Sequence, residues 1–152
     1  MTRDTNAAAL PDLKRTFDAD GPRAALAYLN SLTDQRFTSM YRFDGPTLHA
    51  ITFYDRENPQ VNACDDIPVH ASYCVFVRDS GRMFSMSASL TDERVVDHPK
   101  RSIVQSYCGV PLFNQRGEMF GSICHFDTKP GKVADVDVEL LEHMAHLLQK
   151  RL

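Results

Sequence analysis

Residues 107–127 read YCGVPLFNQRGEMFGSICHFD. Two apolar segments of strand length flank a polar turn that contains Gly117, which is the pattern of a β-hairpin. The same stretch carries three side chains with possible chemistry, Cys108, Cys124 and His125. The pattern therefore predicts a hairpin, and its two thiols either form a reactive site or line the wall of a pocket.

A second hairpin and two helices surround this stretch in the sequence. Residues 36–43 and 47–54 alternate apolar and polar side chains on either side of a turn with the sequence Asp-Gly-Pro. Residues 22–33 and 135–152 carry apolar side chains at helical spacing, which predicts a helix near each end. Strand hairpins combined with terminal helices predict an α+β fold with a mostly antiparallel sheet.

The middle of the chain, residues 60–105, is less regular. We expect a short helix over 72–80, a short strand over 82–87, and brief helical turns over 89–96 and 98–104. Because two end helices can cover one face of the sheet, this middle segment has to cover the other face.

Length, composition and charge exclude several classes of protein. The 152 residues are 43% hydrophobic and 24% charged, values typical of one globular domain. A formal net charge of −3 argues against a nucleic-acid partner, which needs a basic surface. No apolar run approaches the ~20 residues that cross a bilayer, and the N-terminus lacks the apolar core of a secretory signal. We therefore expect a cytoplasmic protein without a membrane partner, with a flexible leader over 1–14 and one domain over 15–152.

The four cysteines and six histidines show no metal-binding pattern. The cysteines are not arranged as CxxC, and their spacings match no zinc or iron–sulfur motif. The histidines form no HxH or HExxH motif. We therefore predict no metal site, and we expect reduced thiols, at least two of which are small buried hydrophobic residues.

The hairpin resembles the closing hairpin of GAF domains, in which strands of the form Y-x-G-V-P-L and G-x-L-C-x-x-D lead into a long C-terminal helix. The resemblance covers about residues 15–152. It implies a GAF/PAS-like fold with a central antiparallel sheet of about five or six strands. The terminal helices would lie on one face, and a ligand pocket would lie between the other face and residues 62–105. The matching residues are Tyr107, Gly109, Val110, Pro111, Leu112, Gly121, Ser122, Ile123, Cys124, Phe126 and Asp127.

The same resemblance implies a sensory function. GAF domains are typically small-molecule sensors that report through their end helices to an attached output domain. Since this chain shows no output domain, we expect a stand-alone domain that acts on a signalling partner in trans. The apolar stripes of the end helices also predict a homodimer through those helices. The resemblance predicts no fixed cofactor and leaves haem or another small ligand open.

The predicted pocket residues lie between positions 53 and 107. Four arginines occur in the same segment and would suit a small anionic or amphipathic ligand, although a solvated surface explains them equally well; they are Arg78, Arg82, Arg94 and Arg101. The predicted ligand-binding residues are Phe53, Cys74, Phe76, Phe84, Met86, His98 and Tyr107.

An alternative function is the reduction of a small sulfoxide, because the free methionine-(R)-sulfoxide reductases are GAF enzymes that use pocket cysteines. That chemistry needs a nucleophilic thiolate and a second thiol within reach to form a disulfide. The candidates in this chain are Cys74, Cys108 and Cys124. Before their closing strand those enzymes carry the motif HIACD, whereas residues 98–107 of this chain contain no cysteine. The reductase is therefore our second hypothesis, after a sensor without catalytic activity.

Overall fold

Four α-helices and six β-strands form within residues 2–151, which are the residues that the computed structural model describes, with side chains described from residue 9 onward. Three single turns of 3-10 helix lie in the middle segment, at Val69–Ala71, Ser89–Thr91 and Glu93–Val95. The helices are α1 (Thr2–Asp20), α2 (Pro22–Ser31), α3 (Cys74–Ser80) and α4 (Asp135–Gln149). The strands are β1 (Phe37–Asp44), β2 (Thr47–Asp55), β3 (Ile67–Pro68), β4 (Phe84–Met86), β5 (Ser106–Phe113) and β6 (Met119–Asp127).

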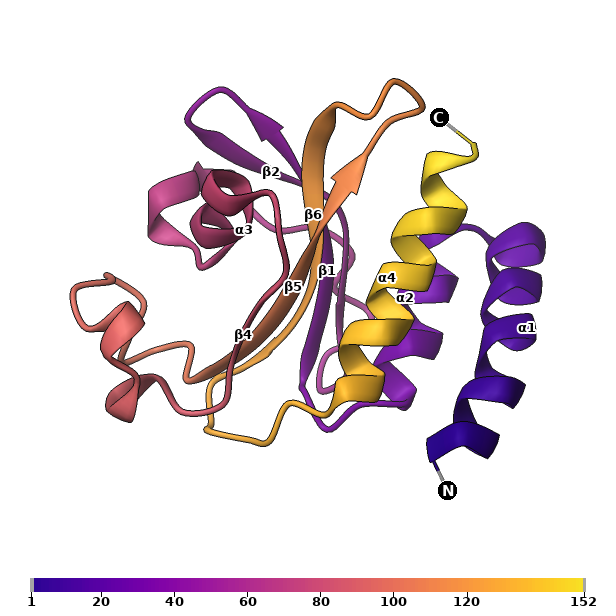
Figure 1. The fold of residues 1–152 in the computed structure, drawn as a ribbon, viewed down its shortest axis with the longest axis horizontal. Helices are drawn as coiled ribbons and strands as arrows, with labels where there is room; N and C mark the ends of the chain where they lie inside the picture. The colour runs from indigo at the N-terminus through magenta and orange to yellow at the C-terminus, as the bar shows by residue number, and fades with distance from the viewer. Residues whose placement is uncertain (1, 152) are drawn as a thin grey trace.

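The strands form one six-stranded sheet in the order β3-β2-β1-β6-β5-β4 (Figure 1). Every neighbouring pair of strands is antiparallel. Both predicted hairpins are present, β1–β2 and β5–β6, and they meet at the centre of the sheet through β1 and β6. The predicted α+β fold with a central antiparallel sheet is confirmed.

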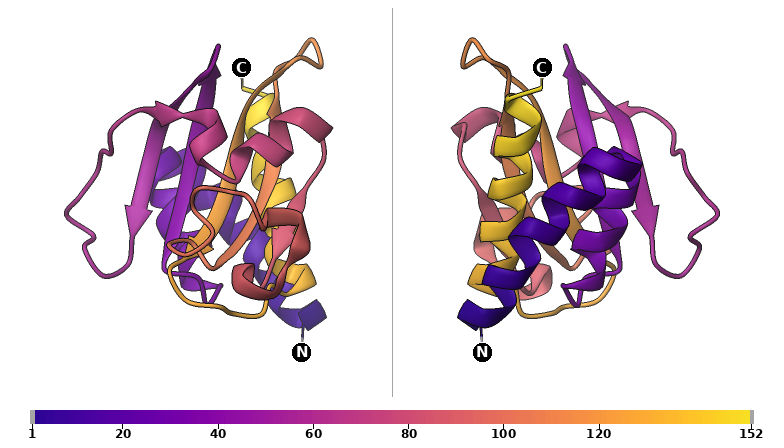
Figure 2. Two further views of the ribbon diagram at one scale, coloured as in Figure 1. Left: turned by 90° about the vertical axis from the view of Figure 1, so that its left-hand side faces the viewer. Right: turned by 90° about the vertical axis from the view of Figure 1, so that its right-hand side faces the viewer.

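The terminal helices cover one face of the sheet. Helices α2 and α4 lie against the strands, and α1 lies outside them, where it crosses both (Figure 1; Figure 2, right). A hydrophobic core fills the space between these helices and the sheet. None of the helices in the described part of the chain is long and apolar enough to span a membrane.

The stretch expected as a flexible leader, residues 1–14, is helical from Thr2 onward, and residue 1 lies outside the described residues. Ala9, Leu13 and Phe17 are spaced four residues apart, and all three side chains are buried in the core beneath α1. Residues four apart lie on the same face of a helix. The apolar stripe thus begins earlier than we had expected from the sequence, and it draws α1 onto α2 and α4.

The middle segment covers the opposite face of the sheet, as expected. Helix α3 packs against β5 and β6, and β4 extends the sheet beyond β5. The helical turn expected over 98–104 is reduced to isolated hydrogen-bonded turns. One runs from the Arg101 amide to the His98 carbonyl at 3.1 Å, and one of helical type runs from the Val104 amide to the Lys100 carbonyl at 2.9 Å.

The two cysteines of the closing hairpin lie on opposite faces of the sheet. In the β5–β6 register, Cys108 is opposite His125, and Gly109 is opposite Cys124. Because successive side chains of a strand alternate between faces, Cys108 belongs to the core under the terminal helices, whereas Cys124 belongs to the core under α3.

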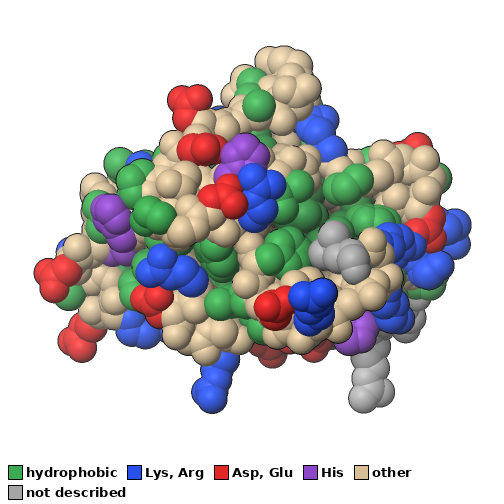
Figure 3. All heavy atoms as spheres, turned by 90° about the horizontal axis from the view of Figure 1, so that it is seen from above, with side chains coloured by type: hydrophobic (Ala, Val, Ile, Leu, Met, Phe, Trp, Pro, Cys, Tyr) green, Lys and Arg blue, Asp and Glu red, His purple; other side chains and the backbone are tan. Residues whose placement is uncertain are grey.

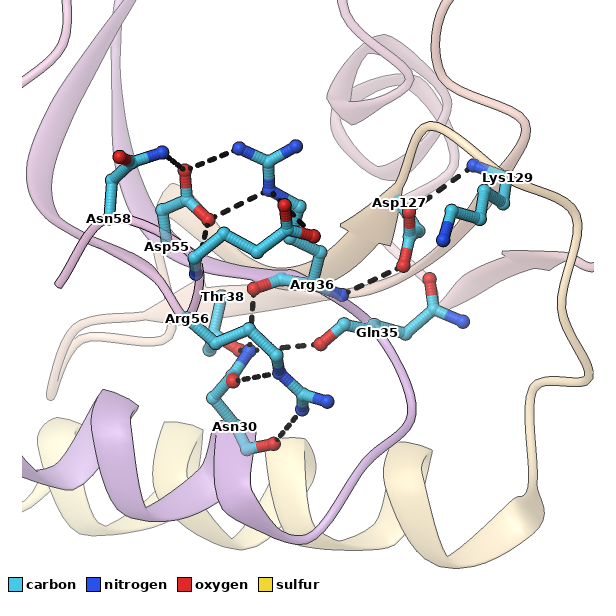
Figure 4. A network of polar contacts seen from close by, with 10 residues as sticks. Asn30, Gln35, Arg36, Thr38, Asp55, Arg56, Asn58, Asp127 and Lys129 are labelled. Atoms are coloured by element: carbon cyan, nitrogen blue, oxygen red, sulfur yellow. Dashed lines mark hydrogen bonds and ion pairs between the residues drawn. The ribbon is translucent and has the colours of Figure 1, made fainter.

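A polar network fixes one end of the sheet (Figure 4). The side-chain amide of Asn30 donates to two backbone carbonyls at the start of β1, at 3.0 and 3.1 Å, and to the Thr38 hydroxyl at 2.9 Å. Arg36 pairs with Asp55 at 2.8 Å, and the Arg36 amide donates to the Asp127 carboxylate at 3.0 Å. These bonds join α2, β1, β2 and β6, so the network holds the strands that form the floor of the site described next.

Candidate ligand-binding site

A cavity of about 300 Å³ lies between the sheet and the middle segment. Its floor comes from four adjacent strands, with Tyr41 on β1, Phe53 on β2, Tyr107 on β5, and Cys124 and Phe126 on β6. Side-chain alternation points these positions away from the terminal helices. The floor is therefore mainly aromatic, with one thiol near its centre.

Two segments of chain form the walls. One wall is the connection from β2 to β3 together with the turn that follows it, and the other is the segment after His98. The Tyr73 hydroxyl donates to the Val104 carbonyl at 2.9 Å and so joins the two walls. The volume is at the lower end of the range for small-molecule sites. The wall residues are Cys64, Asp65, Ile67, Ala71, Ser72, Tyr73, Lys100, Ile103 and Val104.

Two of the seven predicted ligand-binding residues line this cavity, and a third contacts one of them. Phe53 and Tyr107 line the floor. Cys74, at the start of α3, lies beside the cavity on the same face of the sheet, and its sulfur accepts a hydrogen bond from the Tyr107 hydroxyl at 3.3 Å. The prediction that these residues bind a ligand remains a prediction.

The other four predicted residues pack beside the cavity. Phe76 stacks on Phe84 with 4.6 Å between ring centroids, and the His98 ring lies 4.5 Å from the ring of Tyr73. Met86 is buried in the same core. Burial lowers the pKa of His98, and its Nε2 atom lies 3.0 Å from the Ser72 carbonyl, so the neutral ring donates to that carbonyl. This cluster supports one wall and does not border the cavity.

Sequence analysis missed most of the wall. The connection between β2 and β3 has no periodic pattern, and residues 100–104 had been assigned to a helical turn. Tyr41 and Phe126 were placed on strands, but a bulge between Met40 and Tyr41 means that the facing of β1 and β2 cannot be read by simple alternation. The family signature had marked Phe126, and this was the one available signal for it.

Charged side chains are sparse at the cavity. Of the residues that border it, Lys100 and Asp65 carry charge, one on each wall. None of the four arginines expected nearby borders the cavity. Arg94 pairs with Asp92 at 2.6 Å, and Arg101 donates to two backbone carbonyls of the middle segment. The end of the molecule shown in Figure 3 carries charges of both signs around a centre of hydrophobic side chains.

The Cys74 sulfur lies among several hydrogen-bond donors. Besides Tyr107, the Ser122 hydroxyl donates to it at 3.2 Å, and the Cys124 thiol lies in the same buried cluster and interacts with it. Burial opposes ionisation of Cys74, but the hydrogen bonds from Cys124, Ser122, Ser72 and Tyr107 outweigh burial and lower its pKa to about 6. The two adjacent thiols therefore share one proton above that pH.

The three other cysteines have raised pKa values. Burial and the neighbouring Cys74 raise the pKa of Cys124 well above its ordinary value. Burial raises the pKa of Cys108 to about 12 on the far face of the sheet, so the three cysteines of the reductase hypothesis do not converge on one site. Cys64 is exposed at the wall, and desolvation with nearby Asp65 raises its pKa.

One buried hydroxyl of the sheet has incomplete hydrogen bonding. Ser39 on β1 is fully buried, and its Oγ atom makes no hydrogen bond of normal geometry among the described residues, although the Tyr41 side chain is near enough to interact with it. Its cross-strand neighbours are Phe53 and Cys124, and both line the floor. Ser39 therefore faces the cavity side of the sheet. Within the described residues, no group of three or more His, Cys, Asp and Glu side chains is placed to hold a metal ion.

The sequence profile of the GAF domain matches residues 9–152. The chain belongs to the GAF domain family. A curated relative of this GAF domain is a cyclic di-GMP phosphodiesterase from Pseudomonas aeruginosa, 32% identical over 89 residues, which are 56% of this chain. The match spans only 15% of that protein's length.

Solved structures show the same fold. The GAF domain of a phosphoenolpyruvate-protein phosphotransferase from Acinetobacter has a TM-score of 0.77 at 13% identity, covering 96% of this chain and 91% of that chain. A free methionine-R-sulfoxide reductase from Neisseria meningitidis, solved with its substrate, has a TM-score of 0.74 at 20% identity, covering 94% and 85%. At these identities the likeness shows the fold alone.

Proposed function

We propose that this GAF domain binds a small molecule in the cavity between the sheet and the middle segment, and acts as a sensory or regulatory module. The observation that carries the proposal is the cavity of about 300 Å³ with an aromatic floor and one side chain of each charge on its walls, Lys100 and Asp65. Such a site suits a compact molecule with an apolar body and polar ends.

The sheet offers a route from ligand to output. Strands β1 and β6 form the cavity floor on one face and carry core residues under the terminal helices on the other, Met40 and Ile123. A ligand that shifts the floor strands therefore acts on α2 and α4. A homodimer through the terminal helices, a signalling partner in trans and a cytoplasmic location are parts of this proposal, and the free cysteines suit a reducing compartment.

The test is native mass spectrometry of the purified protein, combined with thermal-shift screening of a small-metabolite library. We expect a retained small molecule or at least one compound that raises the melting temperature. Ala71→Trp fills the cavity from one wall and should abolish the response, whereas Leu90→Trp on an exposed turn should not. The proposal fails if no compound is bound, or if both variants respond like the wild type.

A second candidate function is thiol-dependent reduction of a small sulfoxide. It is favoured by the contact between Cys74 and Cys124, since Cys124 borders the cavity. Two thiols reduce a sulfoxide to a sulfide and water while they form a disulfide. Because Cys108 lies on the opposite face of the sheet, this reaction would use Cys74 and Cys124 alone.

Turnover of free methionine sulfoxide with thioredoxin as the reductant tests this candidate. A reductase should lose its activity in Cys74→Ser and keep it in Cys108→Ser. The absence of turnover in the wild type would exclude the reductase and leave ligand binding as the function.

A further inference from the structure

The contact between Cys74 and Cys124 has features that packing alone does not require. Both side chains are 0% exposed, and they come from different elements, α3 and β6. Two hydroxyl groups, from Tyr107 and Ser122, point their hydrogens at the Cys74 sulfur. A sulfur that only fills space needs no such donors, whereas donors stabilise a sulfur that carries negative charge.

The two thiols have different access to the cavity. Cys124 lies in the cavity floor, and Cys74, which does not line the cavity, lies next to it between α3 and the sheet. Because the pKa of Cys74 is lowered and that of Cys124 is raised, the Cys74 sulfur carries the charge and the Cys124 sulfur keeps the proton. A small molecule that reaches the floor therefore meets the Cys124 thiol with a thiolate directly beside it.

Ser39 is a second polar group next to Cys124. Its hydroxyl is buried, makes no hydrogen bond of normal geometry among the described residues apart from an interaction with the Tyr41 side chain, and belongs to the residue opposite Cys124 on the neighbouring strand. It marks a polar position in the sheet beside the floor thiol.

We propose that Cys74 and Cys124 form a redox-active dithiol at the cavity floor, which small hydroperoxides oxidise to a disulfide. This inference rests on the same cavity as the proposed function, but it needs neither the proposed ligand nor the reductase activity.

The shape of the site favours a hydroperoxide over a sulfoxide. The thiolate attacks the terminal oxygen of a hydroperoxide, and that oxygen leads the molecule into the floor. In a sulfoxide the attacked sulfur carries two carbon substituents. These substituents would have to enter the fully buried floor together with that sulfur.

The reaction balances with one hydroperoxide for each pair of thiols. The thiolate bonds to the outer oxygen, the O–O bond breaks, and the leaving alkoxide takes the remaining thiol proton and departs as an alcohol. The second sulfur, now a thiolate, attacks the sulfenic acid. The S–S bond forms, the S–O bond breaks, and the hydroxide takes a proton from solvent to give water. The two sulfurs are oxidised and the peroxide is reduced.

The experiment adds one equivalent of hydrogen peroxide to the reduced full-length protein at pH 7. We expect two of the four thiols to be lost, an intact mass lower by two hydrogen atoms, and a peptide map that links Cys74 to Cys124. Cys74→Ser and Cys124→Ser should abolish the link. Cys108→Ser, which removes the thiol on the far face of the sheet, should form it at the wild-type rate.

Tyr107→Phe separates reactivity from folding, because it removes one hydroxyl donor and keeps the ring. The observed rate of oxidation should rise with pH and level off above about 6 in the wild type. In Tyr107→Phe this inflection should move to higher pH, and the rate at pH 6 should fall about tenfold, as expected for the loss of a hydrogen bond to a charged group.

Three outcomes would overturn the inference. They are an oxygen adduct without a cross-link, a disulfide that involves Cys64 or Cys108, and no reaction under conditions in which the denatured protein reacts. Thermal-shift screening of the reduced protein tests ligand binding independently of oxidation. Ligand binding without oxidation would overturn this inference alone, and oxidation without any ligand would overturn the proposed function alone.

Discussion

His125 shows how a single buried side chain on β6 links two layers of the fold. Its ring is 1% exposed, and burial lowers its pKa to about 3, so the ring is neutral at pH 7. The Thr38 hydroxyl accepts from Asn30 at 2.9 Å and lies 2.7 Å from His125 Nδ1. Nδ1 is the acceptor that the described hydrogen bonds offer to the hydroxyl hydrogen, so Thr38 donates to Nδ1 and the ring hydrogen is on Nε2.

This neutral histidine predicts a loss of stability in mild acid. The pKa of His125 is lower in the folded than in the unfolded state, so its contribution is complete above about pH 6.5 and is lost as the pH falls toward 3. Between pH 7 and pH 5, the free energy of unfolding from urea titrations should fall by up to about 2 kcal/mol. In His125→Asn, which keeps an acceptor, this fall should be smaller. An equal slope in both proteins would contradict the assignment.

Asn30 predicts a larger effect on stability. The two hydrogens of its amide are shared among three acceptors at the start of β1, and its Oδ1 atom accepts one hydrogen bond from Arg56 at 2.8 Å. Asn30→Ala leaves buried carbonyls without donors and should lower the free energy of unfolding by about 3 kcal/mol. Asn62→Ala, at an exposed position of the connection between β2 and β3, should change it by less than about 0.5 kcal/mol. Equal effects of the two substitutions would show that the hydrogen bonds of Asn30 do not stabilise the fold.

At the scale of the elements, the contact between β1 and β6 is the closest approach of the two hairpins. Gly121 on β6 is opposite Arg42, and a Cβ atom at this glycine would lie 1.9 Å from the backbone oxygen of Tyr41. Only glycine fits there, which explains its place in the family signature in physical terms. In the turn of the same hairpin, Gly117 has a φ of +77° and open space around it.

These two glycines predict unequal costs for the same substitution. Gly121→Ala has to push two central strands apart and should lower the free energy of unfolding by at least about 3 kcal/mol. Gly117→Ala meets only the strain of a left-handed backbone and should cost about 1 kcal/mol. Chemical denaturation of both variants checks this, and similar costs would contradict the register of β1 with β6.

Helix α1 gives a second prediction at this scale. Leu13 is 0% exposed beneath α1, so Leu13→Ala should cost about 2–4 kcal/mol. Leu90→Ala, on a turn that is 52% exposed, should be nearly neutral. If Leu13→Ala were also neutral, residues 1–14 would be the flexible leader that the sequence had suggested, and α1 would not be part of the folded domain.

For the whole molecule, the fold was more accessible from the sequence than the site. The closing hairpin, the first hairpin, α2 and α4 are set by local periodicity and turn residues, and all four were predicted. The facing of Cys108 and Cys124 depends on the register of β5 with β6, which local patterns do not encode. The cavity walls come from irregular connections that meet only in three dimensions, as Asp65 and Lys100 do. Sequence reasoning therefore found Phe53 and Tyr107 but not the facing walls.

The most direct test of the central claim, that this cavity takes a small molecule, is methyl NMR of the four isoleucines during a fragment screen. Ile67 and Ile103 border the cavity, Ile123 is buried under the terminal helices, and Ile51 is exposed on β2. We predict that binding fragments shift the methyl signals of Ile67 and Ile103 and leave those of Ile51 and Ile123 in place. A screen in which no fragment moves Ile67 and Ile103, or in which the hits move Ile51 or Ile123 instead, would contradict the account.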